Sequence, residues 1–344
     1  MRPPALVSVV ALATALLGAG EGLPASSDLL RDLLTRQLSL TDSQADTVRR
    51  GEPVVVALET AVPSEIAIGG AVRINAPASR LVAVVRDIER LEQGGGFIAT
   101  RKFSSPPREA DMAAFQLPEQ DIASLRTCRP GRCEVKLGQR ALQAVAAIDW
   151  DAASAPAQAN RLMRRMGVEC IQRYRSGGNA ALPVYQDAGS PVSIAGEFED
   201  MVRRLPGLAA IPEVAAYLLQ YPRARPAGVQ DFFYWSLAEF GLKPVLRLNH
   251  VVIHPTRPAS GLQYAITTKQ LYASHYFHTA LELRMLVDDA ERPGRAHYLV
   301  VLNVARADGF GGLLGGVVKG KARTGALNGL GSALVAMKRR AERS

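Results

Sequence analysis

The chain has 344 residues, of which 48% are hydrophobic and only 6% aromatic, and its formal net charge is +9. A basic protein can bind nucleic acid. The low aromatic content, however, argues against a platform on which bases stack, and the export signal described next argues against it too, so we expect no nucleic-acid partner. Arginine and lysine residues occur in clusters along the chain. These clusters indicate either contact with an anionic membrane surface or a solvated arginine-rich exterior.

The first 20 residues read as a secretory signal. Residues 5–17 form an apolar run of 13 after Arg2, and small residues follow it at 18–20. A run of this length is short for a bilayer, which needs about 20 residues. We therefore predict an exported protein, with a bacterial periplasm as its expected location; an uncleaved N-terminal anchor is the alternative.

Helices and strands alternate in the segment 21–106, which we assign to N-terminal helices and the first part of a sheet. Apolar residues at helical spacing predict helices, and alternating or β-branched runs bounded by turn residues predict strands. The expected helices are 27–38, 41–50 and 78–92, and the expected strands are 53–58, 64–75 and 97–104.

The segment 107–228 changes to a helical period, and we interpret it as a mainly helical subdomain inserted into the sheet. The expected helices lie near 119–125, 137–148, 156–176, 192–204 and 211–221. In an oxidising compartment, Cys128 and Cys133 of the CRPGRC loop can form a disulfide, which leaves Cys170 free. A metal site is the weaker interpretation, because no second cysteine pair or nearby histidine exists, and we predict none.

Strands resume in the segment 229–344, and one long helix ends it. The aromatic-rich segment 231–240 is interpreted as a short helix, followed by strands 245–254, 262–287 and 297–305. The second of these is too long for one strand, so it is either bent or broken near Ala273 and Ser274. Residues 310–343 form the last helix, whose eight glycines indicate close approach to the sheet, a flexible ligand gate or fraying.

The junction in residues 71–92 resembles the opening of the START-like (Bet v1-like, polyketide cyclase-like) superfamily. There a short alternating strand runs through Asn75-Ala76-Pro77 into an amphipathic helix. The resemblance implies an α+β helix-grip fold, in which an antiparallel sheet wraps a long C-terminal helix around an apolar cavity. It also implies that the last helix covers that cavity.

Strand parity supplies the candidate ligand site. His250 shares a face with apolar residues, and on the long run the odd-numbered positions are apolar, so Lys269 and His275 are predicted to point into the same interior. We predict that these three orient the polar end of a ligand. Its apolar part would contact Phe277, Leu281, Leu283, Leu313, Leu314 and Val317. Equally open are a catalytic acid–base set and plain core residues.

No catalytic motif accompanies these residues. The chain lacks a G-x-S-x-G elbow, an S-x-x-K or H-E-x-x-H motif and a P-loop, and we predict neither catalytic residues nor cofactors. The leading hypothesis is a binder or carrier of a lipid or other apolar small molecule. The alternatives are a cyclase- or hydrolase-like enzyme acting in the same cavity, and an envelope interaction protein without a ligand. The sequence leaves the oligomeric state open.

Overall fold

The computed structural model describes residues 26–239, 243–256, 261–309 and 315–343. Its centre is an eight-stranded antiparallel sheet with the strand order β1-β2-β10-β9-β8-β7-β6-β3. The strands are β1 (Val54–Leu58), β2 (Glu65–Ile74), β3 (Phe97–Lys102), β6 (Gln230–Ala238), β7 (Val245–Pro255), β8 (Leu262–Ala273), β9 (Phe277–Asp288) and β10 (His297–Ala307). A separate two-stranded pair joins β4 (Val184–Tyr185) to β5 (Val192–Ser193).

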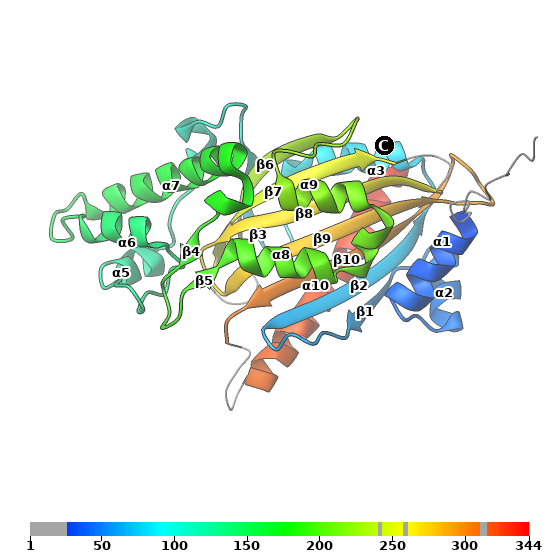
Figure 1. Ribbon diagram of the computed structural model, residues 1–344, viewed down its shortest axis with the longest axis horizontal. Coiled ribbons are helices and arrows are strands. Elements are labelled where there is room, and N and C mark those ends of the chain that lie inside the picture. The colour runs from blue at the N-terminus through cyan, green and yellow to red at the C-terminus, as the bar shows by residue number, and fades with distance from the viewer. Residues whose placement is uncertain (1–25, 240–242, 257–260, 310–314, 344) are drawn as a thin grey trace, which may run out of the picture.

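Helices cover both faces of this sheet (Figure 1). The long helix α10 (Gly315–Arg343) lies on one face with α3 (Ala78–Arg86), and we call this the gripped face. Helices α8 (Ile194–Arg204) and α9 (Pro212–Gln220) lie on the other, which we call the insertion face. The remaining helices are α1 (Ser26–Asp32), α2 (Asp42–Arg49), α4 (Ile88–Leu91), α5 (Glu119–Leu125), α6 (Gln139–Ala146) and α7 (Ala155–Gly177).

The predicted fold class is confirmed: the protein is α+β, with a large antiparallel sheet, a long C-terminal helix packed on it and helical segments inserted between β3 and β6. The arrangement is compatible with a helix-grip fold. The strand-to-helix junction lies where the sequence predicts it, since β2 ends at Ile74 and α3 begins at Ala78, directly after Pro77. Pro77 suits this position because its fixed φ is close to that of a helix.

On the gripped face, the second half of α10 fills the groove between the sheet and α3. Leu330, Leu334 and Met337 are buried there against Val72 and Leu81. The first half of the helix is exposed instead, and Gly316, Gly320 and Gly325 have no atom near the position of a Cβ. The glycines of this half therefore do not serve close packing against the sheet.

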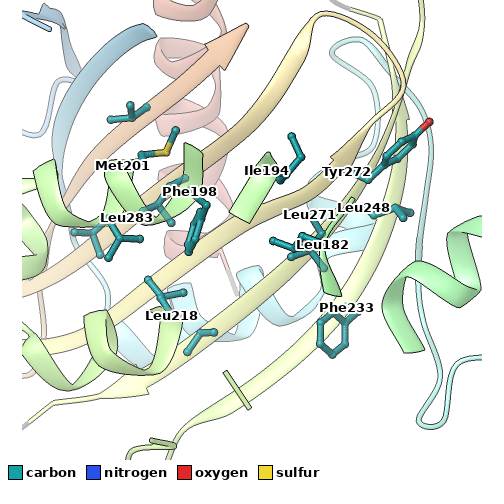
Figure 2. Close-up of a cluster of buried hydrophobic side chains, with 14 of the residues drawn as sticks. Leu182, Ile194, Phe198, Met201, Leu218, Phe233, Leu248, Leu271, Tyr272 and Leu283 are labelled. Carbon is teal, nitrogen blue, oxygen red and sulfur yellow. The ribbon is translucent and has the colours of Figure 1, made fainter. Parts of the chain in front are cut away.

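On the insertion face, the inserted helices and the sheet share one core. Figure 2 shows Phe198 and Met201 of α8 pointing toward the sheet, above Leu283 of β9. The buried Arg306 of β10 adds ion pairs to Glu65, Glu197 and Asp200, which join α8 to the sheet. The insertion thus forms a layer of the fold, because its apolar side chains are buried against the strands.

Two sequence predictions need correction or completion. Within the segment 231–240, residues 231–238 are not a helix: they lie on strand β6, whose Phe233 and Trp235 pack on the insertion face while Tyr234 packs on the gripped face. Residue 240 lies outside the described residues. Aromatic residues on both sides of a central strand hide the period of two. The long run 262–287 is broken at residues 274–276, which form the turn between β8 and β9.

The expected signal segment, residues 1–20, lies outside the described residues, as do Leu313 and Leu314 of the last helix. Among the helices that the structure describes, none has the length and apolar character needed to cross a membrane. The five helices expected in the insertion are present as α5 to α9, with ends shifted by a few residues.

Candidate functional site

The residues predicted to line one site lie in three different places. Lys269, His250, Leu281 and Leu283 share the insertion face, where register pairs His250 with Lys269 and Lys269 with Leu281. They therefore face α8 and α9 and not α10. Of the helix residues named, Val317 is 60% exposed. These four strand residues share one face, as strand parity predicts, but the layer that packs on this face is the insertion and not α10.

Lys269 and His250 belong to a chain of hydrogen bonds buried between the sheet and the insertion, which we call the Lys269 chain. The Lys269 amine donates to Tyr174 of α7 (3.4 Å) and to the side-chain oxygen of Asn179. Tyr174 also lies 3.4 Å from Nδ1 of His250, whose Nε2 lies 3.3 Å from Asp231. Tyr217 donates to Asp231 at 2.6 Å, so the chain runs from a buried amine toward the surface.

Burial governs the charges of this chain. It lowers the pKa of the Lys269 amine well below the ordinary value, and no carboxylate bonded to the amine opposes the effect. Burial also lowers the pKa of His250, although the bond to Asp231 counteracts it. For Asp231, burial acts to raise the pKa, but the hydrogen bonds from His250 and Tyr217 outweigh it and lower the pKa. The amine instead lies 3.6 Å from the centre of the Phe198 ring.

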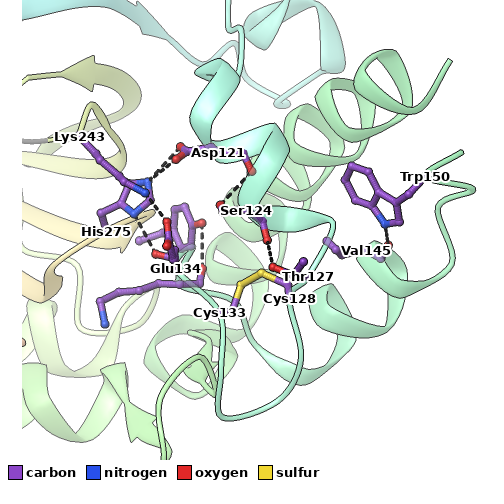
Figure 3. The surroundings of a disulfide bond; sticks show 12 residues. Asp121, Ser124, Thr127, Cys128, Cys133, Glu134, Val145, Trp150, Lys243 and His275 are labelled. Carbon is purple, nitrogen blue, oxygen red and sulfur yellow. Dashed lines mark hydrogen bonds and ion pairs between the residues drawn. A yellow bond between two sulfur atoms is a disulfide. The ribbon is translucent and has the colours of Figure 1, made fainter. Parts of the chain in front are cut away.

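His275 and Phe277 lie away from the Lys269 chain. His275 is on the turn between β8 and β9, where strand parity does not apply. Its Nε2 is 3.0 Å from the buried carboxylate of Asp121 in α5, and its Nδ1 is 2.9 Å from the carbonyl of Glu134 (Figure 3). Phe277 is half-buried at the start of β9. The structure thus joins His275 to the insertion and not to Lys269.

Replacing His275 with alanine should lower the free energy of unfolding by about 1–3 kcal/mol, because the buried Asp121 carboxylate would lose its partner. Thermal unfolding measures this loss, and ligand content in the same preparation should not change. A variant that unfolds normally but has lost a bound molecule would instead return His275 to a ligand site.

The Cys128–Cys133 disulfide closes the loop after α5, as predicted (Figure 3). Cys170 is free and buried in α7. Replacing both loop cysteines with serine should lower stability by about 2 kcal/mol, the loop-entropy value for so short a closure. Wild-type protein treated with a reductant should show the same loss in denaturant unfolding. Equal stability with and without the bond would contradict this expectation.

The gripped face carries a group of polar side chains that the candidate site predicted from the sequence does not include. On five neighbouring strands, polar residues lie toward one end of the face and apolar residues toward the other: Asn249 precedes Val251, and Glu282 and Arg284 precede Leu286. We call the polar set the polar belt. It consists of Ser236, Arg247, Asn249, Thr268, Gln270, Glu282, Arg284 and Asn303, with Glu92 from the end of α4.

Internal contacts leave the belt electrically balanced. Arg284 forms an ion pair with Glu282, and Arg247 lies 3.4 Å from Glu92. Asn303 donates to Glu282 at 3.1 Å. Each guanidinium therefore has a carboxylate neighbour, and the belt offers no net charge to a ligand.

Several N–H groups of the belt nevertheless lack an acceptor. Nδ2 of Asn249, Nε2 of Gln270 and Nε of Arg284 are buried and have no hydrogen-bond partner among the described residues. Asn249 and Gln270 are cross-strand neighbours that are 2% and 4% exposed. A buried donor without an acceptor costs about 1–3 kcal/mol, so this face gains stability when an acceptor is supplied.

Sequence reasoning missed the belt because Glu282 and Arg284 on β9 do not share the apolar face that strand parity selected. A usable signal was present on β7, where Val251 and Ile253 occupy the same face as Arg247 and Asn249. A strand face exposed to water would not carry such large apolar residues at alternate positions. Within the described residues, no group of three histidine, cysteine or acidic side chains is arranged to hold a metal ion.

No protein-family model and no curated protein matches this chain.

Proposed function

We propose that this protein is an exported START-like carrier that binds a lipid or other apolar small molecule on the gripped face of its sheet. The observation that supports it is the polar belt with its three unpaired N–H groups beside a continuous apolar surface. An amphipathic molecule matches such a face, since its apolar part is removed from water while its polar end supplies acceptors.

The belt also restricts the chemistry of the ligand's polar end. Its arginines are balanced by Glu282 and Glu92. Apart from Oε1 of Glu282, which forms the ion pair with Arg284, its buried atoms without a hydrogen-bond partner are N–H donors. The matching group is uncharged and rich in acceptor oxygens, such as an ester, hydroxyl or amide carbonyl. A strongly anionic headgroup would lie beside two carboxylates, which is unfavourable.

Helix α10 leaves room for this role. It packs chiefly on β2, β1 and α3, at one side of the gripped face, while the belt lies on β6 to β10. The exposed first half of α10 carries Val317 and Val318, two of the few exposed large apolar residues of the described chain. These two valines lie at the same end of the sheet as the polar belt, since Lys319 of α10 donates to the carbonyl of Pro63, just before β2.

Export fits the same proposal. The apolar N-terminal run, followed by small residues, supports a secretory signal, and the disulfide is compatible with an oxidising compartment. A carrier in the periplasm would move apolar molecules between membranes.

Organic-solvent extraction of the purified protein, followed by mass spectrometry, tests the function. We expect one co-purifying amphipathic molecule per chain, with an uncharged oxygen-bearing polar end. Protein that contains no such molecule, and that binds none when incubated with monoacylglycerol, would contradict the carrier proposal.

A further inference from the structure

Strand β1 forms an open edge of the sheet. It is the first strand in the sheet order, and within the part of the chain that the structure describes it pairs only with β2. In an antiparallel pair, every second residue turns its N–H and C=O away from the partner strand. Natural edge strands usually carry charges that discourage further pairing, but Val54 to Leu58 carry none.

Two grooves border this strand, one on each face of the sheet. The larger, of about 670 Å³, lies between β1 and α10 and is lined by Val55, Leu327, Gly331, Val335 and Arg339. The smaller, of about 460 Å³, lies on the insertion face and includes Leu58, Met201 and Leu205. Side chains of a strand alternate between the two faces, so a strand added beside β1 would direct its side chains toward both grooves.

We propose that β1 binds an extended segment of a partner polypeptide, which pairs with the open edge and places alternate apolar side chains in the two grooves. The unpaired backbone groups repeat at the spacing of a strand, and only a polypeptide backbone offers matching donors and acceptors at that repeat. This interaction is separate from the proposed lipid site, since the belt lies on β6 to β10 and the grooves lie at β1.

Charge specifies the partner further. Arg339 is the charged residue of the larger groove, and among the described residues no carboxylate pairs with it. The whole chain has a net charge of +9. The partner segment should therefore carry a carboxylate that reaches Arg339, in addition to its apolar residues.

Fluorescence anisotropy with synthetic peptides tests the proposal. The probe is a nine-residue peptide of valine residues that ends in aspartate, so that apolar side chains face both grooves, with N-methyl groups placed on one residue at a time. Edge pairing predicts that methylation at every second position abolishes binding, whereas methylation at the intervening positions has little effect. Uniform sensitivity along the peptide, or no binding at all, would overturn the proposal.

Substitutions at two positions test whether the peptide binds in the larger groove. Gly331→Leu should fill it and weaken binding by at least ~10-fold, whereas Gly331→Ala is the matched control, because a Cβ there meets only Val55 at an ordinary 3.9 Å. Arg339→Glu should reverse the preference for a terminal aspartate over a lysine. Sedimentation of the protein alone completes the test: a dimer that Gly331→Leu dissociates would identify a second copy as the occupant and overturn the assignment to a different partner.

Discussion

Replacing Lys269 with methionine should raise the free energy of unfolding at pH 7 by about 1–4 kcal/mol, the range found when apolar groups replace buried ionic groups. The amine is fully buried, and its partners are a tyrosine, an asparagine and aromatic rings. Folding must therefore remove it from water without an opposing carboxylate. Urea unfolding of the wild-type protein and the variant measures the difference.

The pH dependence of this gain has a defined sign. The pKa of Lys269 is lowered in the folded protein from an ordinary 10.5, so the unfolded chain binds the proton more tightly. Wild-type stability should consequently rise with pH between the lowered pKa and 10.5, and the advantage of the methionine variant should shrink over that window.

Lys136 provides the matched control. It is also buried, but it forms ion pairs with Asp187 (3.3 Å) and Asp308. Lys136→Met should destabilise the protein by about 3–5 kcal/mol, because it leaves carboxylates unpaired. If Lys269→Met destabilises the protein as much as Lys136→Met does, Lys269 is a structural anchor and our account of its desolvation is wrong. A stabilised variant would show that the lysine is retained despite its cost to folding.

Replacing Asn249 and Gln270 together with leucine should raise stability and abolish ligand binding. Two buried N–H groups without acceptors disappear, and each should add about 1–3 kcal/mol to the free energy of unfolding. The bound molecule loses two donors, so its occupancy after purification should fall at least ~10-fold. Melting temperature and extracted ligand are measured on the same sample.

Thr267→Val is the control for this pair. Thr267 is a neighbour on β8 whose buried hydroxyl also has no partner among the described residues, but it faces the insertion. The valine variant should gain stability and keep its ligand. Loss of the ligand in both variants, or retention in both, would remove the polar belt from the binding site.

Much of the architecture follows from local sequence patterns. The Asn75-Ala76-Pro77 junction, the five inserted helices and the break after Ala273 are readable from residue spacing and turn residues. Strand β6 is not, because its aromatic residues pack on both faces and leave no alternating pattern. Local patterns report the period at which apolar residues recur in a helix or strand. They do not identify an element whose two sides are both apolar because both are packed.

The predicted site failed for a different reason. Parity placed Lys269, Leu281 and Leu283 on one face, and the register confirms this grouping. Parity cannot say which layer covers that face. The insertion covers the more apolar face, so the gripped face carries residues that a two-layer fold would expose to water, including Glu282 and Arg284. Because the inserted helices cover one face of the sheet and α10 packs on the other, neither face can be assigned to solvent from strand parity alone.

Photo-crosslinking tests the central claim, that a lipid or other apolar molecule binds on the gripped face. The protein is incubated with a monoacylglycerol that carries a diazirine on its acyl chain, irradiated and mapped by peptide mass spectrometry. We predict crosslinks to residues of the gripped face such as Tyr234, Val251 and Leu286. Crosslinks confined to the insertion face, at Phe198 or Leu283, would contradict the account.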